Sequence, residues 1–348
     1  MIAPKLTFFC ELAAGPLQEL FADQAVIDDL LGLGATVSLG TLDLTLERVE
    51  VVRRLNESGV PVIAWLLLPE EQGCWPNAGN TAAVAARYDR LRAWSADHGL
   101  SWAGIGLDIE PDKREIRRLL DHWRAALPGI LRRVVYGAGL RRAAREYGDL
   151  VGRIHADGYP VDSYVIPFVA DGRQVGSTLL QRVAGLVDVP AEREVPMLYT
   201  SFLRPLGPGV LWSYAAGARS VGVGSTGGGV QIGGVGGIPP LDWDELSRDL
   251  RLARRRTDDV HVFSLEGCAR QGFLGRIRTL DWSEPVAPPT ELAARVNQYR
   301  RALRAVLWIE AHPAALVGGL IAARWLLRRI ARTCCGGTCR AAARVARG

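Results

Sequence analysis

Short apolar runs alternate with amphipathic helical patterns along most of this chain, and that alternation limits the folds available to it. The repeat is about thirty residues long, which is typical of parallel strands joined by crossover helices. With 48% hydrophobic residues among 348, the chain has enough apolar material for a large core. The apolar runs predict nine strands, at residues 6–11, 36–42, 61–68, 102–110, 132–136, 162–168, 195–201, 219–224 and 260–266.

Amphipathic stretches between these runs predict helices. They cover residues 17–33, 46–56, 81–98, 113–127, 141–155 and 243–256. An α/β fold of the (β/α)8 TIM-barrel type accommodates this pattern within its usual length of about 250 residues plus insertions. Nine strands are one too many, so either 132–136 or 219–224 is expected to lie outside the barrel. The alternative is an open doubly wound sheet, which takes nine strands without strain.

The C-terminal part of the chain differs from the rest. A Pro-rich linker at 285–290 separates a barrel domain, 1–284, from a basic helical tail, 291–348. The tail carries 11 Arg against Glu291 and Glu310, a net charge of +9, which leaves −4 of the total of +5 for the remainder. This asymmetry argues against a nucleic-acid groove on the barrel.

An uncharged stretch within the tail, 311–323, is followed by several arginines. It is shorter than the roughly 20 apolar residues of a membrane-spanning helix. We therefore expect the segment 305–332 either to make peripheral contact with an anionic membrane or to pack under the barrel. The amino terminus has no pattern of a secretory signal, which predicts a cytoplasmic protein, peripheral at the inner face of the membrane if the tail binds lipid.

No cofactor is expected from the sequence. Gly222, Gly224 and Gly227 follow a predicted strand as G-x-G-x-x-G. A dinucleotide site needs a helix to begin there, but glycines continue up to Pro239 and Pro240. The six cysteines show no paired spacing, so reduced thiols are expected.

The most informative segment is WAGIGLDIEPD, 102–112, an apolar run that ends in Asp108 and Glu110. Residues two apart on a strand point the same way, so both carboxyl groups are expected to face one cavity at the mouth of a barrel. Crowding of like charge and partial burial then raise the pKa of one of them. Cleavage of a glycosidic bond requires such an acid, and Glu110, nearer the mouth, is the better candidate.

The residues of this segment resemble a known motif. Chitinase-type glycoside hydrolases, family 18, carry D-G-x-D-x-D-x-E at the end of the fourth barrel strand, and AGIGLDIE is similar to it. Gly104, Asp108 and Glu110 agree with the motif, while Ala103 and Gly106 replace two aspartates.

That family also has M-x-Y followed by Asp or Asn on its sixth strand, and MLYT at 197–200 is similar to it up to the last residue. The resemblance implies a TIM-barrel glycosidase in which Glu110 is the general acid and Asp108 steers an acetamido group of the substrate. It implies that Tyr199 is the hydrogen-bond partner in the same subsite. The family's tryptophan on the last strand has no counterpart in HVFSLEG, 261–267.

Further carboxylates are expected at the same mouth. Glu266 ends the last predicted strand, Glu11 ends the first, and Asp43 follows the second. A retaining glycosidase needs a second carboxylate at roughly 5 Å as nucleophile, and an inverting one needs it at roughly 6.5–9.5 Å as base. Glu266 or Glu11 can serve either way, and Glu11 and Asp43 are also candidates for binding substrate.

Aromatic residues near the strand ends favour a carbohydrate substrate, because indole and phenol rings stack on sugar rings. Trp65 lies in the third predicted strand, Trp75 in the loop that follows it, and Tyr164 in the strand at 162–168. Together with the carboxylates, they lead to the prediction of a glycoside hydrolase that binds a carbohydrate.

Two other functions remain open. The strand-end carboxylates can instead hold a divalent cation in a metal-dependent lyase, isomerase or phosphodiesterase. Against this, no histidine falls at the carboxyl end of a predicted strand, and no metal site is assigned. The second is a barrel that has lost catalysis and binds glycans or associates with a membrane, which the two replaced aspartates permit.

Overall fold

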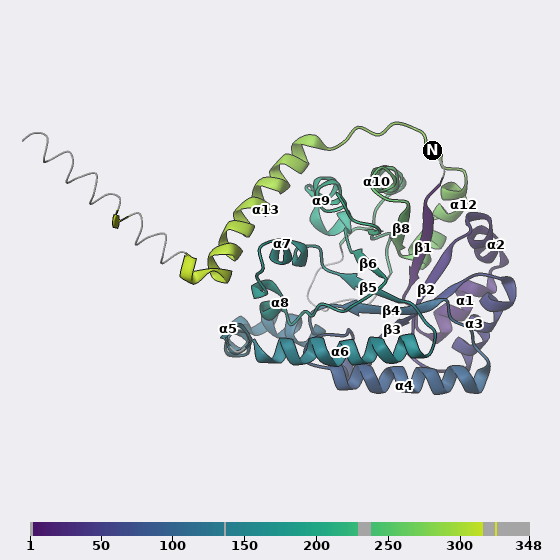
Figure 1. The fold of residues 1–348 in the computed structure, drawn as a ribbon. Coiled ribbons are helices and arrows are strands. Elements are labelled where there is room, and N and C mark those ends of the chain that lie inside the picture. The colour runs from purple at the N-terminus through teal and green to yellow at the C-terminus, as the bar shows by residue number, and fades with distance from the viewer. Residues whose placement is uncertain (1–2, 136, 229–237, 316–323, 326–348) are drawn as a thin grey trace, which may run out of the picture.

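A computed structural model describes residues 3–135, 137–228, 238–315 and 324–325 of the chain. Within them, eight strands form one parallel sheet in the order β6-β5-β4-β3-β2-β1-β8-β7. After β6, Met197 forms a parallel bridge with Gly222 of β7, so the two ends of the sheet meet in a nearly closed barrel (Figure 1). The strands are β1 (Lys5–Cys10), β2 (Thr36–Gly40), β3 (Val62–Leu66), β4 (Gly104–Ile109), β5 (Val161–Val165), β6 (Arg193–Pro196), β7 (Val221–Gly224) and β8 (Asp259–Phe263).

This order confirms the TIM barrel, and the alternative of an open doubly wound sheet is wrong. The ninth predicted strand, at 132–136, is wrong too, because residues up to Val135 belong to a helix; residue 136 lies outside the described residues. Glu115 and Arg133 lie on opposite sides of a kink at His122, whose backbone is not helical, and they form an ion pair at 2.5 Å. The run at 219–224 contains β7, which pairs with β8.

Helices surround the barrel (Figure 1). They are α1 (Ala14–Ala22), α2 (Gln24–Leu33), α3 (Leu46–Ser58), α4 (Thr81–His98), α5 (Lys113–Val135), α6 (Ala138–Ala156), α7 (Val169–Gln174), α8 (Leu179–Ala184), α9 (Gly207–Tyr214), α10 (Trp243–Arg254), α11 (Leu265–Arg270), α12 (Phe273–Arg278) and α13 (Thr290–Ala311), with 3-10 turns at Glu70–Gln72 and Thr200–Leu203. The predicted helix at 17–33 is two helices, because the side chain of Asp23 accepts a hydrogen bond from the Ala25 N–H and begins α2.

Side chains alternate between the two faces of each strand, and β4 shows how this builds the site. Ile105, Leu107 and Ile109 belong to the core between the strands and the helices. The residues between them, Gly106 and Asp108, face the interior of the barrel, which holds a separate aromatic cluster. Alternate residues of this segment therefore face the outer core and the barrel interior, which explains the period of two in the sequence.

The amino-terminal end of the barrel is filled by charged side chains. Arg193 of β6 forms ion pairs with Asp162 of β5 at 3.1 Å and with Asp259 of β8 at 3.0 Å. His261 of β8 is fully buried, and its Nε2 lies 3.5 Å from Asp259. These pairs lie at the opposite end of the strands from Asp108, so the two ends of the barrel have different chemistry.

The C-terminal helix α13 packs along α9 and α7 at the side of the barrel (Figure 1). Asp171 of α7 is fully buried and accepts a 3.0 Å hydrogen bond from Arg300 of α13 and a 2.5 Å one from Tyr214 of α9. Ala293, Val296 and Leu307 of α13 are buried. The beginning of the predicted tail is therefore a helix docked on the barrel.

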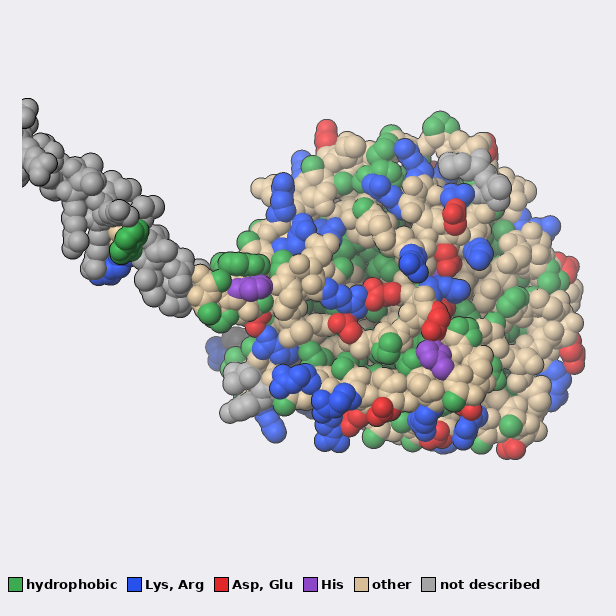
Figure 2. Space-filling view, in the orientation of Figure 1, with side chains coloured by type: hydrophobic (Ala, Val, Ile, Leu, Met, Phe, Trp, Pro, Cys, Tyr) green, Lys and Arg blue, Asp and Glu red, His purple; other side chains and the backbone are tan. Residues whose placement is uncertain are grey.

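Most of the segment predicted to contact a membrane lies outside the described residues, which include only 305–315 and 324–325 of it. No helix in the described part of the chain combines the length and apolarity needed to cross a bilayer. On the face shown in Figure 2, acidic and basic side chains are interspersed over the barrel.

Candidate active site

A cavity of about 140 Å³ lies at the carboxyl ends of the strands. It contains seven of the nine predicted site residues, and Asp43 and Glu266 do not line it. The cavity is lined by Phe9, Glu11, Trp65, Trp75, Asp108, Glu110, Tyr164, Met197, Tyr199, Phe202, Gly228 and Phe263. The closed barrel thus brings together side chains that are up to 254 residues apart in the sequence, since the lining runs from Phe9 to Phe263.

Asp108, near the end of β4, is the most deeply buried carboxyl group of this cavity, with 2% of its surface exposed. Its Oδ1 has no hydrogen-bond partner among the described residues. Burial and the neighbouring carboxyl groups of Glu110 and Glu11 raise the pKa of Asp108 well above its usual range. The indole N–H of Trp65 lies near enough to oppose that rise, but without normal hydrogen-bond geometry.

Glu110 follows β4 and lies partly exposed on the same side as Asp108. Its backbone N–H donates a 3.2 Å hydrogen bond to the Pro76 carbonyl, which fixes the chain where the strand ends. Burial raises the pKa of Glu110 to about 7. No arginine or lysine in the described part of the chain forms an ion pair with it, so a protonated carboxyl is available near neutral pH.

Glu11 follows β1 and supplies the third carboxyl group of the cavity, with 7% of its surface exposed. Its charge raises the pKa values of Asp108 and of Tyr199, which places it within electrostatic reach of both. The sheet order separates β1 from β4 by β2 and β3. Glu11 and Glu110 therefore enter the cavity from different sectors of the barrel.

Tyr199 lies after β6, and its ring stacks on Phe263 with the ring centres 5.3 Å apart and the planes at 26°. Burial first, and then the charges of Asp108, Glu110 and Glu11, raise the pKa of Tyr199 well above its usual range. The phenol therefore keeps its proton and can donate a hydrogen bond into the cavity.

Tyr164 of β5 forms the inner end of the cavity. It is fully buried, and its hydroxyl lies 2.7 Å from the hydroxyl of Ser38 in β2. A Cβ atom on Gly106 would lie 2.6 Å from that phenol oxygen. The space that an aspartate at position 106 would need is thus filled by the tyrosine.

Three aromatic residues of the cavity were not predicted from the sequence: Phe9, Phe202 and Phe263. Phe9 precedes Glu11 by two residues, and the period of two therefore indicated that both face the same side. Phe263 is the last residue of β8, so its position at a strand end was a usable signal. Phe202 lies in the turn after β6 and is 51% exposed at the rim, and no local pattern indicates it.

Asp43, predicted to bind substrate, is instead paired with Arg48 of α3. Its two carboxylate oxygens accept 2.9 Å hydrogen bonds from the guanidinium, which also donates to the carbonyls of Gly40 and Leu12. Burial opposes ionisation of Asp43, but the hydrogen bonds and charge of Arg48 outweigh it and hold its pKa below the usual range. Arg48 is fully buried, so the aspartate serves to neutralise it.

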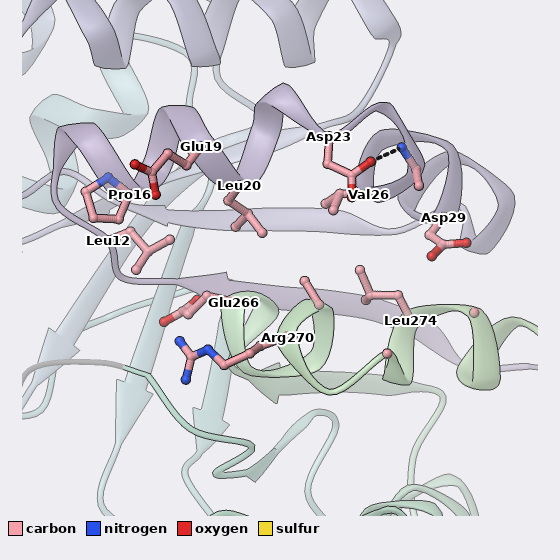
Figure 3. Close-up of a pocket in the computed structure, with 14 residues that line it drawn as sticks. Leu12, Pro16, Glu19, Leu20, Asp23, Val26, Asp29, Glu266, Arg270 and Leu274 are labelled. Atoms are coloured by element: carbon pink, nitrogen blue, oxygen red, sulfur yellow. Dashed lines mark hydrogen bonds between the residues drawn. The ribbon is translucent and has the colours of Figure 1, made fainter.

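Glu266, predicted as nucleophile or base, is not at a strand end. The last strand ends at Phe263 and Ser264 begins α11, because the serine hydroxyl accepts a hydrogen bond from the Gly267 N–H. The buried carboxylate of Glu266 lines a different cavity, of about 660 Å³, between α1, α2, α11 and α12 (Figure 3). It lies behind Gly228, where any side chain would overlap with it.

Within the described residues, no group of three His, Cys, Asp or Glu side chains is arranged to hold a metal ion.

Comparisons with known proteins leave the chain without a family. No family model matches it, and no curated protein matches it in sequence. The chitinase-type resemblance therefore remains a likeness of two short motifs.

Solved structures with a similar fold are distant. Deoxyribose phosphate aldolase from Aeropyrum pernix is 14% identical over 80% of this chain and 90% of that chain, with a TM-score of 0.39. An AP endonuclease, family 2, from Brucella melitensis is 11% identical over 77% and 98%, with a TM-score of 0.40. D-Psicose 3-epimerase from Clostridium cellulolyticum H10 is 13% identical over 87% and 99%, with a TM-score of 0.36. Scores this low carry no argument about activity, and the barrel assignment rests on the strand order of this chain.

Proposed function

We propose that this barrel cleaves a glycosidic bond, with Glu110 as the general acid. The observation that supports this function is one cavity, at the carboxyl ends of the strands, in which three carboxyl groups face aromatic walls. In TIM barrels this end is where catalytic residues gather. A glycosidase needs one carboxyl that is protonated near neutral pH, which the raised pKa of Glu110 supplies, and a second that is ionised, a role that we assign to Glu11.

In the proposed reaction, the carboxyl proton of Glu110 moves to the oxygen of the leaving group as the bond to the anomeric carbon breaks. The electron pair of that bond goes with the leaving oxygen. Positive charge develops on the sugar ring, and the carboxyl groups around it, with Glu11 ionised, stabilise it electrostatically. Aromatic side chains around them exclude water, which strengthens this interaction.

Glu11 is the second carboxylate of the proposed mechanism, in place of Glu266, because Glu11 lines the cavity and Glu266 does not. In a retaining reaction its oxygen attacks the anomeric carbon, and water then releases the sugar with Glu110 as base. In an inverting reaction Glu11 takes a proton from the attacking water. Proton NMR of the first-formed sugar anomer distinguishes the two.

The size of the cavity suggests how much of the substrate it holds. A volume of about 140 Å³ is that of about five water molecules at roughly 30 Å³ each, which suits one six-membered sugar ring and not two. The half-exposed ring of Phe202 lies at the rim. We propose that one ring enters the cavity and that the leaving group remains outside.

The proposal is tested with the full-length protein on a panel of aryl glycosides. Wild type is compared with Glu110→Gln, Glu11→Gln and the control Glu57→Gln, which changes an exposed glutamate of α3. We expect Glu110→Gln to lower kcat/KM by about a hundredfold or more, because it removes general-acid catalysis. The loss should be smallest for aryl leaving groups of low pKa, which need little protonation, whereas the control should keep full activity.

A chelator separates the proposal from the metal-dependent alternative. Activity that survives chelator and disappears in Glu110→Gln supports the glycosidase. Activity abolished by chelator, or unchanged in Glu110→Gln, would overturn it. Turnover of none of the glycosides would also count against it, and would leave the binding of glycans without catalysis as the function to test.

A further inference from the structure

The ionisable side chains that line the cavity in the described part of the chain include acidic groups but no basic ones. Among the described residues that line it there are three carboxyl groups and no Lys, Arg or His. Two cations of neighbouring segments are engaged elsewhere, Arg48 with Asp43 at 2.9 Å and Lys113 with Glu70 at 3.4 Å. Residues 229–237, which follow Gly228, contain no charged side chain. When ionised, Asp108 therefore has no Lys, Arg or His beside it among the described residues that line the cavity.

The walls of the cavity consist largely of aromatic rings, whose faces attract cations. Phe9 lies between neighbours, with its ring centre 5.3 Å from that of Trp65 and 4.7 Å from that of Tyr164. Tyr199 is stacked on Phe263 and packs edge-on against Phe202 at 5.8 Å. Aromatic rings that surround a carboxylate form the kind of cage that binds ammonium groups.

Asp108 supplies an independent indication of a ligand. The side chain is 98% buried, since 2% of its surface is exposed, and it lines the cavity with one oxygen that has no hydrogen-bond partner. A buried polar atom is normally satisfied by a partner, so this oxygen lacks one that a ligand can provide.

We propose that the sugar ring bound in this cavity carries a free, protonated amine, and that Asp108 is its counter-charge. This inference rests on the proposed function for the identity of the ligand as a sugar. An ammonium group donates three hydrogen bonds and neutralises the carboxylate, whereas a hydroxyl at the same place leaves the charge unbalanced. An N-acetyl group is neutral and bulkier, and an anionic sugar would be repelled.

The proposal predicts a proton linkage. Burial raises the pKa values of Asp108 and Glu110, and the neighbouring carboxyl groups of Glu110 and Glu11 raise that of Asp108 further. A bound ammonium group favours their ionised forms, so binding releases protons. The titratable groups that face the ligand, or lie directly behind the lining, are Glu11 and Cys10 from β1 and its end, Asp108 and Glu110 from β4, Tyr164 from β5, Tyr199 after β6, Cys74 beside Trp75 and Glu266 behind Gly228.

Isothermal titration calorimetry of the full-length protein tests the proposal. The probes are glucosamine, N-acetylglucosamine and glucose, and the corresponding three sugars of the galactose series, at about pH 6.5, where the amine is protonated. We expect the amino sugar of one series to bind at least about tenfold more tightly than its hydroxyl and N-acetyl analogues. Titrations in two buffers of different ionisation enthalpy should show proton release for the amino sugar and none for glucose.

Matched variants locate the effect. Asp108→Asn keeps the shape of the side chain and removes the charge, and should abolish both the preference for the amine and the proton release. Asp97→Asn makes the same change at an exposed position of α4 and should alter neither. Because asparagine, like the protonated carboxyl of Asp108, carries no charge, we expect Asp108→Asn to fold, and circular dichroism checks this. If the variant does not fold, the affinities of the wild-type protein for the three sugars of each series still decide the matter.

Three results would overturn the inference: equal affinity for the amine and hydroxyl sugars, preference for the N-acetyl sugar, or no binding of either amino sugar at millimolar concentration. Its failure is distinguishable from that of the proposed function. Hydrolysis of neutral glycosides without amine preference refutes this inference alone. Amine-selective binding with no hydrolysis of any glycoside, amino glycosides included, refutes the catalytic function and leaves the binding site standing.

Discussion

The hydroxyl groups of Tyr164 and Ser38 lie 2.7 Å apart in the interior of the barrel and join β5 to β2, which are not neighbours in the sheet. This hydrogen bond holds the tyrosine ring against the backbone of Gly106. The ring also packs against Phe9 and Trp65, so it has little freedom to move away. The glycine at position 106 is therefore a consequence of the packing of Tyr164.

Replacing Gly106 with alanine should destabilise the protein by about 2 kcal/mol, because the new methyl group overlaps with a ring that cannot yield. Urea denaturation measures the loss. Gly152→Ala is the control, since its Cβ meets nothing within 4 Å in the middle of α6, and it should stabilise by about 0.5 kcal/mol. If Gly106→Ala cost as much in a Tyr164→Leu background as in wild type, the overlap would not be the cause.

The pH dependence of glycoside cleavage should report on Glu110. Because its pKa is raised to about 7, the acid is protonated below that pH and loses its proton above it. We expect kcat/KM to fall tenfold per pH unit above about pH 7 for substrates that need protonation. For aryl glycosides with good leaving groups, kcat/KM should not fall above this pH. If it fell equally for all leaving groups, the titrating residue would not be Glu110.

The same shift predicts a pH effect on stability. Between the usual pKa of 4.5 and about 7, folded Glu110 holds a proton that the unfolded chain has lost, so the free energy of unfolding falls as pH rises through this window. The loss should be on the order of 2 kcal/mol. In Glu110→Gln that part of the dependence should vanish. Asp249, whose burial raises its pKa to about 6, titrates in the same window, so the difference between wild type and variant isolates Glu110.

Asp43→Asn should lower stability without affecting the cavity. The substitution leaves the buried guanidinium of Arg48 with its two backbone carbonyl acceptors but without its counter-charge. Breaking such a pair should cost about 2 kcal/mol, less than for a fully buried pair because Asp43 is 29% exposed. Thermal unfolding and kcat/KM are measured together, with Asp97→Asn as the exposed control. A fall in kcat/KM at unchanged stability would instead show that Asp43 takes part in binding the substrate.

Arg300→Met should loosen α13 from the barrel. The change removes the closest cation from Asp171, which is fully buried, although Arg304 remains at 3.5 Å. The stacking of the guanidinium on the Tyr214 ring, 3.8 Å from its centre, is lost as well. We expect a loss of about 2 kcal/mol and faster amide exchange in α13. Arg301→Met, at an exposed neighbouring position, should have no effect; equal behaviour of the two variants would show that the ion pair does not hold the helix.

The sequence alone predicted a barrel, with an open doubly wound sheet as the alternative, and a pair of carboxyl groups at the end of the fourth strand. Strands alternate with a period of two, and this local rule placed Asp108 and Glu110 on one side without knowledge of the rest of the chain. The apolar runs also placed Glu11 at the end of the first strand and Trp65 within the third. The ninth strand was misassigned because the apolar residues of 132–136 fit a short strand and a helix end equally well.

The tertiary structure decided which of the strand-end carboxylates share a cavity. Asp43 pairs with an arginine only five residues away, but that choice depends on the burial of Arg48 among the carbonyls of Gly40 and Leu12. Glu266 does not line this cavity, because Ser264, two residues before it, caps α11 after the end of the strand. The aromatic walls come from strands far apart in sequence. Local periodicity fixes the side of a strand on which a residue lies, whereas closure of the barrel and competition for partners fix what that residue meets.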